Sequence, residues 1–169
     1  MEKATFWRNY NYGNGSHRAR VVFVNLGGDG NVGTFFFYNG KSVSYRWIDE
    51  RLDKIDSKLM MISVGSCYGG SSIKDLEGGN RIIITSSSDK ELGSVGTSYE
   101  FLKAFINTSA DNDSSGYISI SEAAEYVKEV DTFVDISDPT NPNTNRTPQI
   151  SDIGNLGVTS YLAELKLGT

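Results

Sequence analysis

The sequence predicts an α/β fold with a mostly parallel sheet, and two observations carry this prediction. The first is a set of short apolar runs that each end in small residues, namely Val21–Val24, Leu59–Val64 and Arg81–Thr85. Continuous runs of this kind are typical of strands that are buried on both faces of a sheet. The second is an amphipathic helical stretch between the first run and the second. Helices that alternate with buried strands indicate parallel βαβ units.

The first half of the chain predicts these elements in order. Residues 1–20 are polar and aromatic without periodicity, so we expect a loop there, or one edge strand around Phe6–Tyr12. A short strand is expected at Phe35–Tyr38, before the turn signal Asn39-Gly40. The next element is a helix, because apolar residues recur at steps of four, three and four with charged residues between them. Its apolar positions are Ile48, Leu52, Ile55 and Leu59.

The second half predicts further helices and a long loop. One helix is expected around residues 99–106 and another over Glu122–Val130. All three prolines fall within residues 139–148, so residues 131–152 are expected to form an extended surface loop. This loop could border a substrate cleft or cover the domain as a strap. A short helix over Gly157–Leu167 is expected to close the chain.

The composition excludes several classes of protein. The 169 residues suffice for one packed domain, which we place at residues 21–169 after the polar N-terminal segment. One cysteine and one histidine exclude a disulfide framework, a multi-cysteine zinc site and chemistry that needs two imidazoles. The net charge of −5, without a dense basic cluster, argues against a nucleic-acid partner. No signal-peptide pattern and no membrane span is recognised, so we expect a soluble chain.

The single cysteine lies where an α/β fold places its functional groups. Three small-residue segments follow three predicted strands, at residues 25–30, 65–70 and 86–89, and the carboxyl ends of such strands gather ligands and catalytic groups. Cys67 lies in the second segment, where a helix N-terminus could lower the thiol pKa and glycine N–H groups could stabilise an oxyanion. The alternative is that Cys67 is a small buried residue, as most free cysteines are.

Several segments resemble the caspase-like cysteine peptidases, most closely the legumain-like members. Ser63–Gly70 and Arg81–Ser87 resemble the strand that carries the nucleophile and the strand that follows it. Val21–Gly30 resembles the strand that carries the His-Gly pair of the family, and Thr147–Ser151 resembles a short segment near the end of such domains.

The resemblance implies a fold, a reaction and site residues. The fold would be a caspase-like three-layer sandwich, the reaction peptide-bond hydrolysis, and the partner a peptide or protein substrate. Cys67 would attack the scissile carbonyl, and the backbone N–H of Gly27 would belong to the oxyanion hole. Asp89 and Glu91, near the pocket implied for the residue before the scissile bond, hint at a basic side chain there, although ordinary solvated acids explain them equally well.

Two departures from the family pattern bear on activity. Leu26 stands where the family has its histidine, and a leucine can neither polarise a carbonyl nor transfer a proton. His17, the only imidazole, precedes the predicted strand, so it is either a solvated loop residue or an unusual replacement. The chain also lacks room for the strands that precede the His-Gly strand in the family. An exposed sheet edge would then pair with a missing N-terminal part or with a second copy.

A calcium loop is the strongest spacing motif in the sequence. In residues 111–122, oxygen-bearing residues occupy loop positions 1, 3, 5, 9 and 12, with glycine at position 6, which is the pattern of an EF-hand. A backbone carbonyl at position 7 completes the shell. The predicted Ca²⁺ ligands are Asp111, Asp113, Ser115, Tyr117, Ser119 and Glu122. The alternative is an acidic turn followed by a helix that Ser119 and Glu122 cap.

These observations leave three hypotheses for function. The chain could be a caspase-like cysteine endopeptidase that uses Cys67, with turnover impaired or absent because of Leu26. It could be a pseudoenzyme that binds a peptide or a partner and is stabilised by calcium. It could also be a calcium-dependent structural module in which Cys67 has no role.

Overall fold

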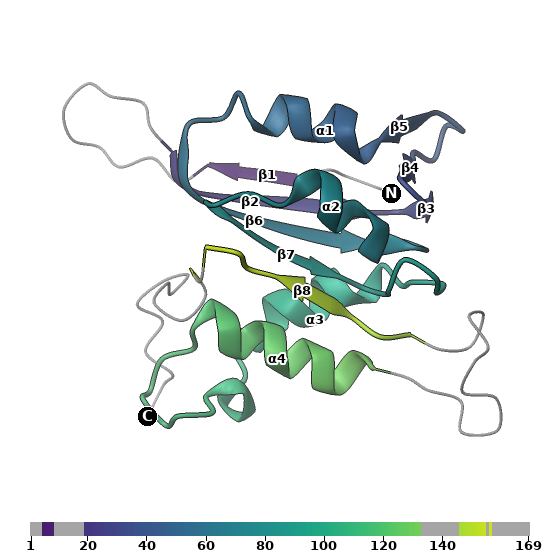
Figure 1. The fold of residues 1–169 in the computed structure, drawn as a ribbon. Helices are drawn as coiled ribbons and strands as arrows, with labels where there is room; N and C mark the ends of the chain where they lie inside the picture. Colours follow the sequence, from purple (N-terminus) through teal and green to yellow (C-terminus); the bar gives the residue numbers. More distant parts are fainter. Residues whose placement is uncertain (1–4, 9–18, 133–145, 155, 157–169) are drawn as a thin grey trace, which may run out of the picture.

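A five-stranded sheet forms the centre of the computed structural model, which describes residues 5–8, 19–132, 146–154 and 156 (Figure 1). The strand order is β1-β2-β6-β7-β8. The three central strands are parallel, and each edge strand is antiparallel to its neighbour. The fold is therefore mixed α/β with a mostly parallel sheet, as predicted. The strands are β1 (Thr5–Arg8), β2 (Ala19–Gly27), β6 (Ser57–Gly65), β7 (Arg81–Thr85) and β8 (Gln149–Ser151).

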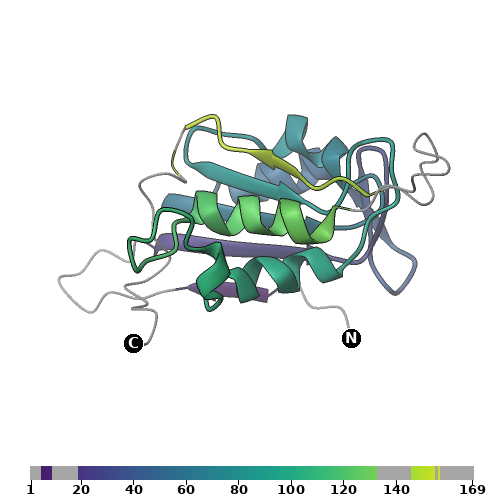
Figure 2. The ribbon, with the colours of Figure 1, turned by 90° about the horizontal axis from the view of Figure 1, so that it is seen from below.

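Helices cover both faces of this sheet (Figures 1 and 2). On one face lie α1 (Tyr45–Leu52) and α2 (Ile73–Leu76), and α2 is preceded by the short 3-10 helix η1 (Gly69–Ser72). On the other face lie α3 (Gly96–Ala104) and α4 (Ile120–Asp131), with the 3-10 helix η2 (Thr108–Ala110) between them. None of the helices in the described part of the chain is long and apolar enough to cross a membrane.

The alternation of side chains along the central strands divides the core into two clusters. In β2, Val22, Val24 and Leu26 pack towards α1 and α2, whereas Phe23 packs towards α3 and α4. Both faces of the central strands are covered, which is why their sequences are continuously apolar. Burial of each large side chain in these clusters contributes about 1.5–3 kcal/mol.

The buried strand β7 begins with a charged residue, Arg81, whose side chain is only 4% exposed. Its guanidinium lies 2.5 Å from the Asp49 carboxylate and 2.6 Å from that of Asp53, and it also donates to the Leu76 carbonyl. These partners satisfy the buried charge, as a buried arginine requires. The contacts fasten α1 to the start of β7.

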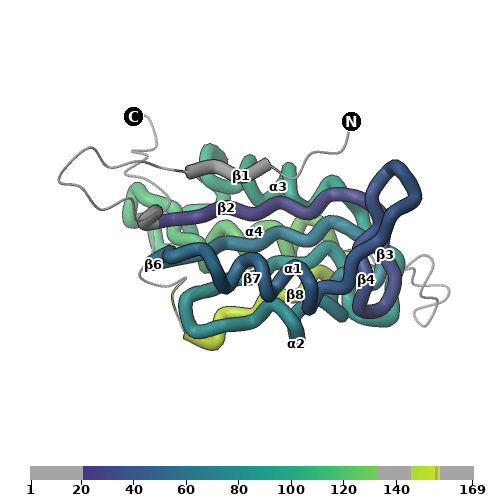
Figure 3. Tube along the Cα trace, turned by 90° about the horizontal axis from the view of Figure 1, so that it is seen from above, coloured from purple at the N-terminus to yellow at the C-terminus, as the bar shows by residue number. Residues whose placement is uncertain are grey.

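A second, three-stranded antiparallel sheet lies beyond the carboxyl ends of β2 and β6 (Figure 3). It consists of β3 (Asp29–Asn31), β4 (Thr34–Phe36) and β5 (Ser42–Ser44). Phe35 of β4 is buried in the core on the α1 side. The hydroxyl of Ser44 then accepts a hydrogen bond from the N–H of Trp47 and caps α1. The small sheet thus leads the chain from the end of β2 to the start of α1.

Some predicted boundaries were wrong. The helix expected to reach Leu59 ends at Leu52, and Leu59 lies in β6, because its side chain is needed on the α3 and α4 face of the sheet. The loop expected over residues 131–152 contains β8, which is defined by its antiparallel pairing with β7 rather than by its own sequence. The edge strand expected around Phe6–Tyr12 is β1. His17 and the helix expected over Gly157–Leu167 lie outside the described residues.

Candidate active site and candidate metal site

Cys67 lies just beyond the carboxyl end of β6, next to the carboxyl end of β2. The parallel register pairs Leu26 with Val64 and Gly27 with Gly65, so the two strands finish at the same level. The N–H of Gly28 donates to the carbonyl of Gly65 over 3.0 Å and extends this pairing by one step. The thiol is free and partly exposed. The predicted nucleophile position is therefore at the carboxyl end of the parallel strands, where α/β folds place ligands and catalytic groups.

The chain turns sharply after Cys67 because Tyr68 adopts a left-handed backbone conformation, with φ 55° and ψ 28°. A tyrosine rarely adopts this conformation, and it persists only where its surroundings fix it. Three hydrogen bonds fix Tyr68. Its N–H donates to the Glu91 carbonyl over 2.8 Å, and its carbonyl accepts from the N–H and the hydroxyl of Ser71. The sequence contains no signal for the left-handed conformation at Tyr68.

Buried hydroxyl groups form hydrogen bonds with Ser66, the residue before Cys67. The carbonyl of Ser66 accepts from the N–H of Gly69 at 3.2 Å, from the Ser86 hydroxyl at 3.1 Å and from the Ser87 hydroxyl at 3.4 Å. The hydroxyls of Ser66 and Tyr45 are 3.0 Å apart and share a hydrogen bond. Tyr45 is fully buried, and burial raises the pKa of its phenol, with a smaller contribution from the nearby Cys67. The phenol is therefore neutral at physiological pH and acts as a hydrogen-bonding group, not as a base.

Two glycines allow neighbouring segments to approach this turn closely. A Cβ atom at Gly93 would lie 2.0 Å from the Ser66 carbonyl oxygen, and one at Gly30 would lie 2.8 Å from the Cys67 carbonyl oxygen. Real Cβ atoms essentially never come so near. The loop after β7 and the strand β3 therefore lie directly against the cysteine turn, and glycine is the residue that fits at both positions.

The space beside Gly27 is open, in contrast. A Cβ atom on Gly27 would meet nothing within 4 Å. Within the described part of the chain, the N–H of Cys67 donates to no acceptor. The Gly28 N–H is engaged with Gly65, so it is not available to an oxyanion, and the part predicted for the Gly27 N–H stays a prediction.

Leu26, at the position predicted for the histidine, is a core residue. It is 6% exposed and belongs to the cluster that also contains Phe35, Tyr45 and Val64. No imidazole occurs among the residues that the structure describes, since His17 lies outside them. This end of the sheet therefore offers a thiol, backbone amides and hydroxyl groups.

The helical segments that follow Cys67 are short. Cys67 is followed by Tyr68, then by η1 and α2, which have four residues each. A single turn has few aligned peptide dipoles, so its macrodipole is small.

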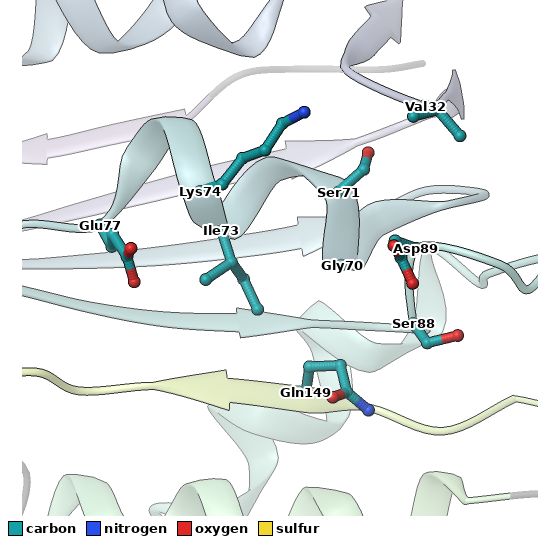
Figure 4. Close-up of a pocket in the computed structure, with 9 residues that line it drawn as sticks. All are labelled: Val32, Gly70, Ser71, Ile73, Lys74, Glu77, Ser88, Asp89 and Gln149. Atoms are coloured by element: carbon teal, nitrogen blue, oxygen red, sulfur yellow. The ribbon is translucent and has the colours of Figure 1, made fainter.

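A shallow groove of about 330 Å³ runs beside the cysteine turn, between α2, the carboxyl end of β7 and the start of β8 (Figure 4). Lys74, Glu77 and Asp89 contribute charges of both signs. The remaining lining residues are Val32, Gly70, Ser71, Ile73, Ser88 and Gln149.

Glu91 has a different role from the one its charge suggested. Its carboxylate accepts hydrogen bonds from the Ser88 N–H at 3.0 Å and from the N–H and hydroxyl of Thr147 at 3.0 and 2.6 Å. Burial alone would raise the pKa of Glu91, but these hydrogen bonds outweigh burial and lower it. Glu91 therefore joins the loop after β7 to the segment before β8, and it does not line the groove.

The acidic loop brings three of the predicted ligands together. One carboxylate oxygen each from Asp111, Asp113 and Glu122 lies within 4.8 Å of the other two, a spacing that could hold a metal ion. Gly116 has a φ of +80°, so the sharp turn expected at loop position 6 is present. The carboxylates also accept backbone N–H groups, from Ser115 to Asp111 and Asp113, and from Asn112 to Glu122.

The other three predicted ligands form the remainder of this loop. The hydroxyl of Ser115 donates to the carbonyl of Tyr117 over 3.1 Å. Ser119 and Glu122 form a reciprocal capping box at the start of α4. The helix cap that was considered as the alternative to a calcium loop is therefore present, and its two residues belong to the acidic loop. The approach differs from the prediction, since α3 ends at Ala104 and η2 stands between it and Asp111.

Hydrogen bonds keep two of the loop carboxylates in the charged form. The side chain and backbone of Ser115 lower the pKa of Asp113. Burial opposes ionisation of Glu122, but hydrogen bonds from Ser119, Asp113 and Asn112 outweigh it and lower the pKa of Glu122. Ionised oxygens at this spacing suit a hard cation such as Ca²⁺.

No protein-family model matches the chain, and no curated protein matches it at a significant level.

Proposed function

We propose that the chain is a caspase-like cysteine peptidase domain, closest to the legumain-like members, whose hydrolytic turnover is impaired or absent. One observation supports this above all. Cys67 follows the carboxyl end of β6, Leu26 lies in the last two residues of the adjacent parallel strand β2, and this side chain at the histidine position is buried. A thiol in this place is suited to attack a carbonyl, but the residue beside it cannot complete the reaction.

The chemistry explains which step is lost. A Cys67 thiolate would add to the scissile carbonyl carbon, and the N–H groups of Gly27 and Cys67 would stabilise the oxyanion. Expulsion of the amine then requires a proton donor, which Leu26 cannot be. Loss of one member of such a catalytic unit costs several orders of magnitude in rate. The domain would therefore react with electrophiles at Cys67 while hydrolysing peptides very slowly.

The second candidate function is a non-catalytic relative that binds a peptide or a partner protein. The groove beside the cysteine turn favours it, because it offers charges of both signs to a polar chain. In this case Cys67 would be dispensable for binding.

Three proteins distinguish the two functions, namely the native chain, Cys67→Ser and Leu26→His. We expect a peptidyl chloromethyl ketone to label the native chain at Cys67, as detected by mass spectrometry, with no measurable hydrolysis of peptides ending in Asn, Asp, Arg or Lys. Hydrolysis should appear in Leu26→His. Native hydrolysis that Cys67→Ser abolishes would contradict impaired turnover, and an unreactive Cys67 would contradict the peptidase assignment even if Leu26→His fails to fold.

We also propose that residues 111–122 bind Ca²⁺ and that the ion holds the connection between α3 and α4. Asp111, Asp113 and Glu122 supply the carboxylates, with Ser115, Tyr117 and Ser119 completing the shell. Titration calorimetry should show Ca²⁺ binding to the native chain and to Glu125→Gln, an exposed position of α4 outside the loop. Glu122→Gln should lose this heat. Equal heats from native chain and Glu122→Gln would refute the site.

A further inference from the structure

Exposed apolar residues form a stripe along α3 (Gly96–Ala104) and the turns that flank it, with Val95 just before the helix and Ile106 two residues after it. Val95, Tyr99, Leu102 and Ile106 are 57%, 67%, 46% and 73% exposed, and they follow one another at steps of four, three and four. The opposite face of the helix packs Phe101 into the core. A surface helix is normally polar on its outer side, and contiguous exposed apolar side chains mark an interaction site.

The helix α3 packs against β2, the strand next to an open sheet edge, since Phe101 of α3 stacks on Phe23 of β2 with ring centroids 6.4 Å apart. In the view of Figure 2, α3 overlaps β1, the first strand of the sheet. β1 pairs with β2 on one side, and no described strand pairs with its other side. An unpaired strand edge is a second feature that favours association.

We propose that the apolar stripe is the interface between two copies of the chain, which a two-fold axis relates. In this interface, α3 packs antiparallel against α3 of the second copy. The spacing of the stripe favours a second copy of the chain as the binding partner. Steps of four, three and four read the same in both directions, so reversal of the helix reproduces the pattern. Val95 then faces Ile106 of the second copy, and Tyr99 faces Leu102. A two-fold interface requires such a self-complementary surface, whereas an unrelated partner does not.

The size and the charge of the surface suit this occupant. The four side chains expose roughly 500 Å² in each copy, so their contact would bury about 1,000 Å², the lower bound for a specific interface. The charged neighbours on α3, Glu100 and Lys103, form an ion pair of 3.3 Å within the helix. They present no net charge to the second copy, although the whole chain carries −5. The proposal does not depend on the activity of Cys67.

The mass of the protein in solution tests the interface. Light scattering should give the mass of a dimer for the native chain at tens of micromolar. Leu102→Glu should raise the dimer Kd by at least ~30-fold, as expected for a central apolar contact. Val130→Glu is the matched control, since Val130 is 48% exposed on α4 and the charge change is the same. A monomeric native chain, or equal responses to the two substitutions, would overturn the proposal.

Two further measurements test the antiparallel pairing. Tyr99→Lys combined with Leu102→Glu should restore the dimer, because each lysine would face a glutamate of the second copy. In a Cys67→Ser background, a mixture of Tyr99→Cys and Leu102→Cys proteins should form a disulfide-linked dimer in higher yield than either protein alone. A dimer that persists in Leu102→Glu, or mixed proteins that cross-link no better than the separate ones, would refute this arrangement.

Discussion

The turn that carries Cys67 and the acidic loop are both short irregular segments, but they are held in opposite ways. Ser66 is bonded by residues 20 and 21 positions away in the sequence, namely Ser86, Ser87 and Tyr45. The carboxylates of the acidic loop accept hydrogen bonds from backbone N–H groups of the same loop, and the bond from Asn112 to Glu122 spans ten positions. The cysteine turn is thus a product of the whole fold, whereas the loop is a local structure. Substitutions should separate the two.

The largest effect is expected from Gly93→Ala. The new methyl group would collide with the Ser66 carbonyl, and the loop after β7 would have to move away from the cysteine turn. We expect a loss of about 3 kcal/mol in the free energy of unfolding, measured by urea denaturation. Gly79→Ala is the control, because a Cβ there meets nothing within 4 Å. Equal stability of the two variants would show that the turn is not held by close packing.

Glu91→Gln should have the next largest effect, and the effect should depend on pH. The amide cannot supply the charge-assisted hydrogen bonds to Ser88 and Thr147, so we expect a loss of about 2 kcal/mol at neutral pH. The folded state lowers the pKa of Glu91, so this stability is present above the ordinary value of 4.5 and is lost as the pH falls through the folded pKa. Urea denaturation at several pH values should show the native chain and the variant converging in acid. A constant difference between them would exclude ionisation as the cause.

Tyr45→Phe should cost about 1.5 kcal/mol, because it leaves the buried Ser66 hydroxyl without its partner. Thermal unfolding measures the loss. The substitution should also change the alkylation rate of Cys67 by iodoacetamide, since Ser66 is its neighbour in the chain. Tyr38→Phe removes a hydroxyl from a tyrosine that is 93% exposed and is the control. If both variants behave like the native chain, the buried hydroxyl does not help to position the turn.

The smallest loss of stability is expected for Gly116→Ala in the acidic loop. Alanine is disfavoured at a φ of +80°, so the cost is about 1 kcal/mol. A Cβ there meets nothing within 4 Å, so the rest of the fold should be unaffected. The alkylation rate of Cys67 should stay the same while Ca²⁺ binding weakens in titration calorimetry. A change in the cysteine rate would mean that the two regions are coupled.

The same difference decides what could be predicted from the sequence. The central strands and the acidic loop could be predicted, because each segment contains its own signal. The strands are continuously apolar, and the loop has oxygen-bearing residues at regular positions. β8 could not, since it has three residues and exists through its pairing with β7. The left-handed turn at Tyr68 and the contact of Tyr45 with Ser66 could not either, because distant residues impose them.

The short strand β8 also affects the order in which the chain can fold. Ile84 in β7 pairs with Ile150 in β8. This side of β7 can therefore form its hydrogen bonds only after β8 has been synthesised. Until then, the backbone N–H and C=O groups along one side of the very apolar strand β7 have no partner. Unpaired edges of this kind promote association of nascent chains. Truncation before Gln149 is therefore expected to lower the solubility of the domain more than its small loss of buried area would suggest.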